Sequence, residues 1–343
     1  MKISVCIPTY NRAIHLANCL HSLIICAENG VDDFEVCISD NASTDDTEAV
    51  VRRAQEVIPI KYHRNSENLG IPRNFLQAVN MAEGDFAWLV GDDDIIMPTG
   101  IARLSRLIDE HPRVDFFYVN AFHMDAEEVL SHPLPFDTRS LPRSMRRFSQ
   151  RRGSGEMPFL ALISPDVSFD FLGGMFLSVF RRKNWNEHAG ALDALAISDM
   201  RTFSHFDNTF PHIRIFSKAF ARSQAYFNED PLIVCLTGAR EWAPKYPLVR
   251  SVRLAEALQV YRSIGLPLWM YLRCRNYALA HFLPDVLRML LRRSESGVEY
   301  ISLLRTILGN IAYPNFYLSP LIDKWRRLQS RTSRLNAPPP GTD

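Results

Sequence analysis

The sequence lacks an uncharged apolar run of the ~20 residues that a membrane-spanning helix needs. Its nearest approach, over residues 306–322, is interrupted by Pro314, Asn315 and Pro320. The N-terminal MKISVCIPTYNR has too short an apolar run for a signal peptide and no small-residue cleavage site, which favours the first strand of a fold. These absences predict a cytoplasmic protein that meets a membrane only at its surface.

Several short motifs that identify common sites are also missing. The six cysteines include no C-x-x-C pair, and no histidine is spaced to complete a zinc site. Cys6 and Cys37 lie in apolar runs, which predicts buried thiols. No G-x-G-x-x-G follows the first predicted strand and no G-x-x-x-x-G-K-[ST] occurs, which disfavours a dinucleotide cradle and a P-loop.

The composition is that of an ordinary globular protein, but the charge is unevenly distributed. The chain has 343 residues, 47% of them hydrophobic, and a formal net charge of +1. Residues 245–334 contain 15 Lys and Arg against 5 Asp and Glu, a net charge of +10, which leaves −8 on residues 1–244 and −1 on Asp343. The chain is an acidic body followed by a basic region.

Short β-branched or aromatic runs alternate with segments of helical periodicity over the first 120 residues. Strands are predicted at residues 3–8, 34–40, 60–64, 86–90 and 115–120. Between the first two, Leu16, Leu20 and Leu23 share one helical face. This alternation indicates βαβ units and predicts an α/β fold with a doubly wound, mostly parallel sheet. Ligands of such sheets bind beyond the carboxyl ends of the strands.

The rest of the chain divides into an irregular part and a helical part. Residues 125–170 predict loops over the sheet, with prolines and a basic run at 143–152. Strands are predicted at 169–185, where Gly173 and Gly174 indicate a close approach of backbone to ligand, and at 230–236. Helices are predicted at 248–264, 268–293, 297–310 and 318–330, and a disordered tail follows them.

SDNASTDDT, residues 39–47, follows the second predicted strand and has two interpretations. Asn41, Ser43 or Thr44 is suited to cap the helix that runs through Val50. Asp40 comes too early to be the obvious cap and lies at the strand end, where a carboxylate can accept hydrogen bonds from a nucleobase or ribose.

GDDD, residues 91–94, follows the fourth predicted strand and also has two interpretations. It is either a solvated turn before a helix that begins at Pro98, or a cation site. Apolar residues on both sides, FAWLV before and Ile95 and Ile96 after, indicate a packed turn. Three packed carboxylates repel one another unless a cation lies between them, and Mg²⁺ or Mn²⁺ would bridge them to a diphosphate.

Taken in order, IPTYNR, ISDNASTDDT and RNSENLGIPRNFLQAVNMAEGDFAWLVGDDD resemble the successive motifs of glycosyltransferase family 2. The resemblance covers roughly residues 1–125 and continues more loosely through 169–240. It implies the GT-A fold and transfer of a sugar, with inversion, from a nucleotide diphosphate donor. The wording of the motifs is most similar to abequosyltransferase-type enzymes of O-antigen assembly.

The resemblance also implies roles for single residues. The residues expected to bind the nucleotide-sugar are Pro8, Tyr10, Asn11, Asp40, Asn68, Gly70, Arg73 and Asp92, with Arg73 available to a phosphate. The family's Asp-x-Asp-Asp metal motif aligns with Gly91, Asp92, Asp93 and Asp94, so the first acid is missing. Asp93, with Asp94 beside it, is the expected ligand of Mg²⁺ or Mn²⁺.

Inverting transfer also needs a carboxylate to take the proton from the acceptor hydroxyl. The family often places it within Glu-Asp, but the only such pair here, Glu229-Asp230, directly precedes a predicted strand. The candidates are Asp207 in HFDNTFPH and Asp199 in AISDMRT, and each has the alternative of an ordinary surface or helix-start acid. Asp207 is preferred because it precedes an apolar helix start, and His212 is expected to be structural.

The basic region has a structural and a functional interpretation. Its predicted helices carry arginines among Trp269, Met270, Leu287, Leu290 and Trp325. This pattern fits a helical appendage with a solvated basic face, and it also fits an amphipathic surface for an anionic membrane leaflet. The predicted division is a catalytic domain at 1–246, with a nucleotide-sugar half at 1–125 and an acceptor half at 126–246, then basic helices at 247–332 and a tail at 333–343.

The leading hypothesis is an inverting hexosyl or deoxyhexosyl transferase of O-antigen or other surface-glycan assembly. Its expected partners are a nucleotide-diphosphate sugar, a glycan or lipid-linked acceptor and the membrane surface, with no nucleic acid. A nucleotidyltransferase is an alternative, but it should show a glycine-rich loop near the first strand, and PTYNR is not one. A sugar-nucleotide-binding or interaction protein without turnover is the other alternative.

Overall fold

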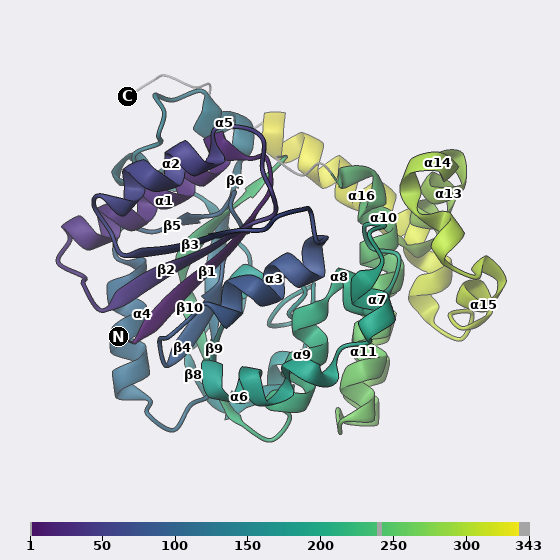
Figure 1. Cartoon of the computed structure of the whole chain (residues 1–343). Coiled ribbons are helices and arrows are strands. Elements are labelled where there is room, and N and C mark those ends of the chain that lie inside the picture. The colour runs from purple at the N-terminus through teal and green to yellow at the C-terminus, as the bar shows by residue number, and fades with distance from the viewer. Residues whose placement is uncertain (1, 239–241, 336–343) are drawn as a thin grey trace.

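One mixed sheet forms the centre of the molecule, which is described here by a computed structural model covering residues 2–238 and 242–335 (Figure 1). Its main strands lie side by side in the order β3-β2-β1-β4-β9-β6-β10-β5, while β7 pairs with β6 and β8 with β10. The strands are β1 (Ile3–Thr9), β2 (Phe34–Asp40), β3 (Ile60–Arg64), β4 (Phe86–Leu89), β5 (Ile95–Ile96), β6 (Phe116–Asp125), β7 (Arg146–Arg147), β8 (Gly155–Pro158), β9 (Ser178–Arg181) and β10 (Gln224–Thr237).

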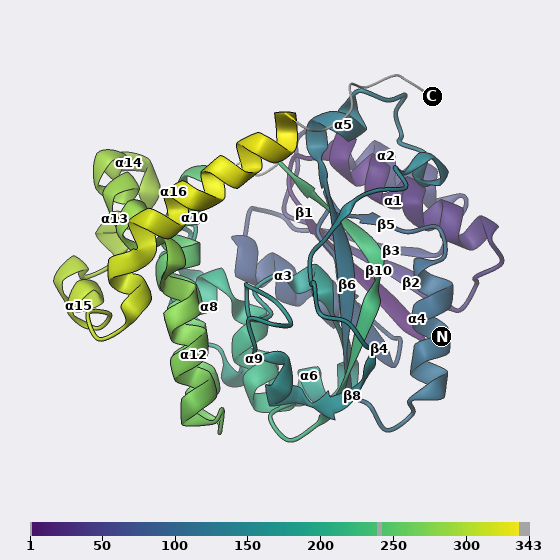
Figure 2. The same cartoon turned by 180° about the vertical axis from the view of Figure 1, so that it is seen from behind.

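Helices cover the sheet, and a group of further helices extends the molecule on one side (Figures 1 and 2). Those before β10 are α1 (Ala13–Glu28), α2 (Thr47–Gln55), α3 (Ile71–Asn80), α4 (Gly100–Glu110), α5 (Ala126–Leu130), α6 (Arg182–His188), α7 (Ala194–Ser198), α8 (Phe206–Thr209) and α9 (Pro211–Ala219). Those after β10 are α10 (Tyr246–Leu248), α11 (Leu254–Ser263), α12 (Leu268–Ala278), α13 (Phe282–Leu291), α14 (Arg293–Ser296), α15 (Leu303–Leu308) and α16 (Pro314–Leu335).

The parallel part of the sheet is built from strands that are apolar on both faces. β1 pairs in parallel with β2 and with β4, β2 pairs in parallel with β3, and β6 pairs in parallel with β10. All seven residues of β2 are buried, as expected when helices cover both faces of a parallel sheet. The strands predicted at 34–40 and 60–64 have these bounds in the structure, so the predicted fold class is confirmed.

The strand predicted at 169–185 is wrong over most of its length. Gly173 and Gly174 lie in a turn, only Ser178–Arg181 form the strand β9, and α6 follows it at once. β9 runs antiparallel to both β4 and β6. The apolar pattern had a different cause, because Phe171 and Leu172 are buried from a turn, and Phe176 and Leu177 from the short 3-10 helix that follows it.

The helices after β10 share the hydrophobic core of the sheet. Leu258, Phe282 and Phe316 belong to the same buried cluster as β1 and β2. α16 begins at Pro314, contains Pro320 and runs to Leu335, so it extends over the start of the tail predicted at 333–343; residues 336–343 lie outside the described residues. Within the described ranges, no helix combines the length and hydropathy that crossing a membrane requires. All six cysteines are buried free thiols, as Cys6 and Cys37 were predicted to be.

Candidate active site

A cavity of about 540 Å³ lies where the carboxyl ends of β1 and β4 meet the loops of the second half. Its near wall contains Tyr10 and Arg12, which follow β1, and the acid turn Gly91–Asp94, which follows β4. The helices after β10 supply part of the far wall. The cavity therefore lies at the edge of a parallel sheet where ligands are expected.

Arg12 pairs with two carboxylates of the acid turn. Its Nε lies 3.1 Å from Asp92 Oδ1, and its Nη2 donates a hydrogen bond of 3.0 Å to Asp93 Oδ2. The Thr9 hydroxyl donates to the other oxygen of Asp92 at 2.8 Å. Asp92 and Asp94 are buried, while the side chain of Asp93 keeps 18% of its surface exposed on the cavity wall. The packed turn predicted from the sequence is therefore present, and a guanidinium lies at two of its carboxylates.

Gly91 has a steric reason to be glycine. A Cβ at this position would lie 2.9 Å from Asp93 Oδ1 and 2.9 Å from Asp94 Oδ2, which is closer than real Cβ contacts. The Gly91 N–H also donates to Asp94 Oδ2 at 3.1 Å. An acid at position 91, as in Asp-x-Asp-Asp, would displace both carboxylates from their present places.

The acid turn fits a divalent ion only with help from a ligand. Among the described residues, no group of three His, Cys, Asp or Glu side chains is arranged to hold a metal by itself. Mg²⁺ commonly takes one or two carboxylates together with phosphate oxygens. Asp93, with Asp94 beside it, would supply the carboxylates, and the ion would neutralise a leaving diphosphate.

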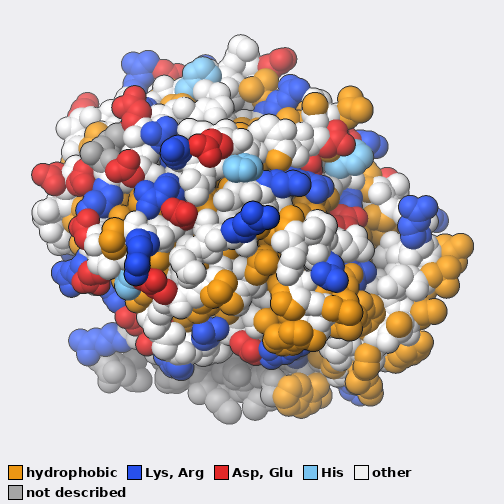
Figure 3. All heavy atoms as spheres, turned by 90° about the horizontal axis from the view of Figure 1, so that it is seen from below, with side chains coloured by type: hydrophobic (Ala, Val, Ile, Leu, Met, Phe, Trp, Pro, Cys, Tyr) orange, Lys and Arg blue, Asp and Glu red, His pale blue; other side chains and the backbone are white. Residues whose placement is uncertain are grey.

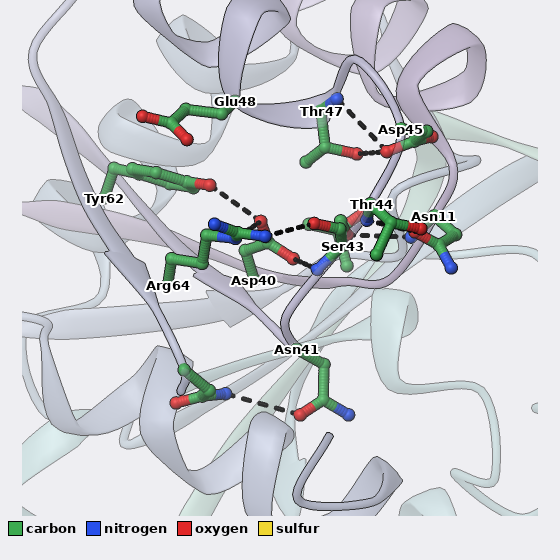
Figure 4. Close-up of polar contacts among 12 residues, drawn as sticks. Asn11, Asp40, Asn41, Ser43, Thr44, Asp45, Thr47, Glu48, Tyr62 and Arg64 are labelled. Atoms are coloured by element: carbon green, nitrogen blue, oxygen red, sulfur yellow. Dashed lines mark hydrogen bonds and ion pairs between the residues drawn. The ribbon is translucent and has the colours of Figure 1, made fainter. Parts of the chain in front are cut away.

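Asp40, at the end of β2, is hydrogen-bonded to the neighbouring strand β3 and to the loop that follows β2 (Figure 4). Its Oδ2 accepts a 2.7 Å hydrogen bond from the Tyr62 hydroxyl, its Oδ1 accepts 2.9 Å from the Ser43 N–H, and Arg64 Nε is 3.8 Å away. Burial, followed by the hydrogen bond to Asp40, raises the pKa of Tyr62. Asp40 is fully buried, and the described residues that line the cavity include its neighbour Asn41 instead.

The loop after Asp40 does not cap α2 as one interpretation of the sequence predicted. Ser43 Oγ accepts from the Asn11 N–H at 2.8 Å, and Asn11 Oδ1 accepts from the Thr44 N–H at 2.7 Å, so this loop is tied to the loop after β1 (Figure 4). α2 begins three residues later, at Thr47, whose N–H donates to Asp45 Oδ1 at 3.1 Å. Ser43 and Thr44 therefore join two strand ends instead of capping a helix, and the Asn41 side chain bonds to Asn68 and to the Leu69 N–H.

The structure brings only part of the predicted nucleotide-sugar set together. Pro8, Tyr10, Asn68, Gly70 and Asp92 line the cavity. Asn11 lies in the loop contact described above, and Arg73 Nη2 donates to Ser198 Oγ at 2.6 Å, both outside the lining. Gly70 has φ +81°, a left-handed conformation that favours glycine, and an added Cβ would lie 3.3 Å from Met200 Sδ.

The two predicted bases occupy different places. Asp199 lines the cavity, but the hydrogen bond from Arg201 lowers its pKa, and His205 Nε2 lies 3.3 Å away. Asp207 is buried, with Arg214 Nε 2.8 Å from Oδ1 and the Asp193 N–H 2.8 Å from Oδ2. It stands outside the described lining of the cavity. Neither position tests the role of these acids, which stays a prediction.

Asp170 is a cavity acid that the sequence did not single out. Burial raises its pKa, and it accepts hydrogen bonds from the Ser168 hydroxyl and, at 2.6 Å, from the Gly174 N–H. These bonds hold a turn in which Phe171 and Leu172 have positive φ angles of 51° and 68°. The predicted strand across 169–185 concealed this acid, since a turn was needed to bring it to the cavity.

His212 is buried and neutral at the cavity wall. Its Nε2 lies 3.1 Å from the carbonyl oxygen of Leu172, and its ring stacks on Phe75 with centroids 6.0 Å apart. Burial lowers its pKa to about 4. A histidine with this pKa carries no charge at neutral pH, in keeping with the structural role expected from the sequence.

The far wall of the cavity is largely aromatic and aliphatic. Its apolar members come from three segments distant in the sequence: Phe148, Phe169, Met175, Phe176, Phe203, Phe210, Trp242, Tyr246, Val249 and Leu254. Arg250 is the cation among them, and it is held by both carboxylate oxygens of Asp285 at 3.0 and 2.6 Å. The cavity thus pairs an ionic near wall with an apolar far wall.

Comparison with known proteins finds a family match for the part of the chain that contains Tyr10, Arg12 and the acid turn. Residues 4–168 match the family described as Glycosyl transferase family 2. This stretch, just under half of the 343 residues, is therefore similar to glycosyltransferase family 2. This match confirms the resemblance that the order of the motifs indicated.

Curated relatives of the family 2 half match over about a third of the chain. Abequosyltransferase RfbV of Salmonella typhimurium is 48% identical over 111 residues, which are 32% of this chain and 33% of that protein. Poly(ribitol-phosphate) beta-N-acetylglucosaminyltransferase TarS of Staphylococcus aureus is 35% identical over 114 residues, 32% of this chain and 19% of that protein. The matches thus span at most about a third of these relatives.

Solved structures share the fold over nearly the whole chain. TarS 1–349 of S. aureus in complex with UDP has a TM-score of 0.53 and 17% identity, covering 95% of this chain and 87% of that one. Mannosyltransferase PcManGT of Pyrobaculum calidifontis, in complex with GDP-Man and Mn²⁺, has a TM-score of 0.54 and 15% identity, covering 94% and 84%. The similarity confirms the GT-A fold predicted for the family 2 domain and its helical extension.

We predict that restoring the missing acid of the family 2 motif will damage the acid turn. Gly91→Asp should lower the midpoint of thermal unfolding more than Gly91→Ala, because both introduce a Cβ at 2.9 Å and only Asp adds a fourth charge. Thermal denaturation of the three proteins measures this difference. A Gly91→Asp protein as stable as the native one would contradict the steric reason given for glycine.

We also predict that His212 makes the protein sensitive to mild acid. The unfolded chain binds a proton near pH 6.5 while the folded chain binds it only near pH 4, so stability is lost as pH falls between these values. The loss between pH 7 and pH 5 should be roughly 2 kcal/mol. Denaturant unfolding at both pH values should show a smaller loss for His212→Gln than for the native protein, and an equal loss would contradict the assignment.

Proposed function

We propose that this protein is an inverting glycosyltransferase that moves a hexosyl or deoxyhexosyl group from a nucleotide-diphosphate sugar to an acceptor hydroxyl. One observation carries the proposal: the acid turn of a family 2 domain exposes Asp93 on the wall of a cavity of about 540 Å³. The nucleotide would lie over Pro8 and Tyr10, with Asp92 on its ribose side. Asp40 would act there through the loop that it holds, unless the donor displaces Tyr62.

A divalent cation, Mg²⁺ or Mn²⁺, belongs to this proposal. Asp93 and Asp94 would hold the ion, and the donor diphosphate would complete its coordination. The Asp92 and Asp93 oxygens now paired with Arg12 support the need for positive charge at this place. The same pairing is the observation that favours the alternative of a sugar-nucleotide-binding protein without turnover, because the guanidinium already supplies that charge.

The apolar far wall supports a proposal about the polarity of the sugar. Hydroxyl groups that enter an apolar site without partners cost free energy, so Phe169, Phe176 and Trp242 favour a sugar or acceptor face with few hydroxyls. The 48% identity with a protein named abequosyltransferase RfbV supports the same direction. A lipid-linked or polysaccharide acceptor of O-antigen or other surface-glycan assembly is proposed on this basis.

The proposed organisation follows the predicted division of the chain. Residues 1–246 would form the catalytic domain, with the donor bound by 1–125 and the acceptor by 126–246, and the basic helices of 247–332 would bring it to the cytoplasmic face of the membrane. The net charge of +10 on residues 245–334 supports attraction to anionic lipids. Arg250 and Leu254 on the cavity wall support a part for this region in shaping the site as well.

The metal assignment predicts that nucleotide binding depends on Asp93. UDP, CDP, GDP or dTDP should raise the midpoint of thermal unfolding, and Mn²⁺ should enlarge the effect for the matching nucleotide. Asp93→Ala should abolish the Mn²⁺-dependent part, because it removes the exposed carboxylate. Asp109→Ala is the matched control, because Asp109 is an exposed carboxylate of α4 outside the described lining of the cavity. A Mn²⁺ effect retained in Asp93→Ala would move the metal elsewhere, and turnover without any Mn²⁺ effect would favour Arg12 as the working cation.

The choice of base is tested by three matched variants. Asp207→Asn should lower sugar transfer by about 10²- to 10⁴-fold while sparing the nucleotide-induced thermal shift, since a general base contributes about that much. Asp199→Asn and Asp170→Asn are compared with it in the same assay, incorporation of sugar into membrane glycolipid from the donor that the nucleotide screen selects. Full activity of Asp207→Asn would contradict its role, and the variant with the largest loss would identify the base.

A further inference from the structure

The last long helix, α16, turns an apolar stripe away from the protein. Tyr317, Leu321 and Trp325 are exposed by 62, 66 and 60% of their surface, and Leu318 between them by 46%. Their spacing of three and four residues places them on one side of the helix. A surface helix of a globular protein normally turns such a stripe toward the core, so the arrangement is reversed here.

The opposite side of α16 is fixed by polar contacts. Asp323 is buried and lies 2.8 Å from His281 Nδ1 and 2.9 Å from Arg288 Nη2. The buried Ser319 accepts from the Leu283 N–H at 3.2 Å, and Phe316 packs on Phe282 with ring centroids 5.4 Å apart. These contacts determine the rotation of the helix about its axis, so the apolar stripe cannot turn inward without breaking them.

Neighbouring helices add to the stripe. Exposed large apolar side chains are Leu268, Trp269 and Leu272 on α12, Leu287, Leu290 and Leu291 on α13, and Leu304, Leu308 and Ile311 on and after α15. Figure 3 shows hydrophobic side chains gathered on the side of the molecule formed by these helices, with Lys and Arg among them. We call the exposed apolar residues of α12, α13, α15 and α16 the docking face.

The charges around the docking face are mostly positive. Exposed basic side chains on these helices and their connections are Arg273, which pairs with Asp166, and Arg292, Arg293, Arg305, Lys324 and Arg326. Of the four acids between residues 265 and 326, Asp285 and Asp323 are buried and paired with arginines, which leaves Glu295 and Glu299 exposed. Apolar side chains surrounded by arginine and lysine suit an interface with anionic phospholipid headgroups.

We infer that the docking face binds the surface of an anionic phospholipid bilayer. Trp269, Tyr317 and Trp325 would lie at the headgroup level, as aromatic side chains do at membrane interfaces, with leucines below them. A second copy of the chain fits less well, because a symmetric contact would bring arginines of both copies together. The inference rests on the proposed function in one respect only, namely that a lipid-linked acceptor would then be met at the same surface.

The docking face is connected to the cavity through a buried carboxylate. Asp285 of α13 is fully buried and accepts hydrogen bonds from Arg288, at 2.7 Å, and from Arg250, which lines the cavity. The same α13 carries Leu287, Leu290 and Leu291 of the docking face. The helices that would touch lipid therefore also hold part of the cavity wall.

Co-sedimentation with vesicles tests the inference on the full chain. The native protein should bind vesicles of phosphatidylcholine mixed with phosphatidylglycerol, and should bind less to phosphatidylcholine alone or in high salt. Leu321→Glu combined with Trp325→Glu should weaken binding at least about tenfold, since two exposed apolar side chains no longer enter the interface. Val57→Glu, 59% exposed just after α2 and across the sheet from these helices, is the matched control and should bind as the native protein does (Figures 1 and 2).

The outcomes separate this inference from the proposed function. The nucleotide-induced thermal shift should be the same in the double variant and the native protein, which shows that the variant is folded. Binding of the double variant equal to that of the native protein would overturn the inference, as would equal binding to neutral vesicles. Light scattering that shows a native dimer and a monomeric double variant would assign the face to a second copy instead. Vesicle binding without any nucleotide effect would leave docking intact and reject the proposed donor site.

Discussion

Repulsion among three adjacent carboxylates is the constraint on which the cavity depends. Asp92, Asp93 and Asp94 are held in a tight turn after a buried strand, where water screens them poorly. Arg12 and Thr9, both from the end of β1, supply the positive charge and the hydroxyl that make this turn tolerable. A ligand that brings its own cation would compete with Arg12 for these carboxylates, and their mutual repulsion would favour its binding.

The sheet brings these partners together because β1 lies directly beside β4. Thr9 and Asp92 are 83 residues apart in sequence, yet parallel pairing places the ends of their strands at the same edge. At the end of the neighbouring strand β2, Asp40 accepts hydrogen bonds from Tyr62 and from the Ser43 N–H. The Ser43 hydroxyl in turn accepts from the Asn11 N–H, which joins the loop after β2 to the loop after β1. This edge of the sheet is thus a set of strand ends tied to one another by side-chain hydrogen bonds.

The helices after β10 join two properties that would otherwise seem unrelated. Toward the sheet they supply Tyr246, Arg250 and Leu254 to the apolar wall of the cavity. Toward solvent, α16 presents Tyr317, Leu321 and Trp325, while its Asp323 is buried and paired with His281 and Arg288. A region with these two faces is suited to connect a membrane surface with the proposed acceptor site.

The amino-acid sequence by itself determined the strands whose carboxyl ends meet at the cavity, and the place of their polar motifs. β2 and β3 have the predicted bounds, and Gly91–Asp94 follow β4 as expected, because local periodicity and strand ends are encoded within short segments. Tertiary structure alone decided that Arg12 pairs with Asp92, that a turn brings Asp170 to the cavity while Asp207 lies behind its wall, and that α16 faces outward. Each of these depends on contacts between residues far apart in the chain, and no periodicity within a single segment records which side of a helix or turn its distant neighbours will cover.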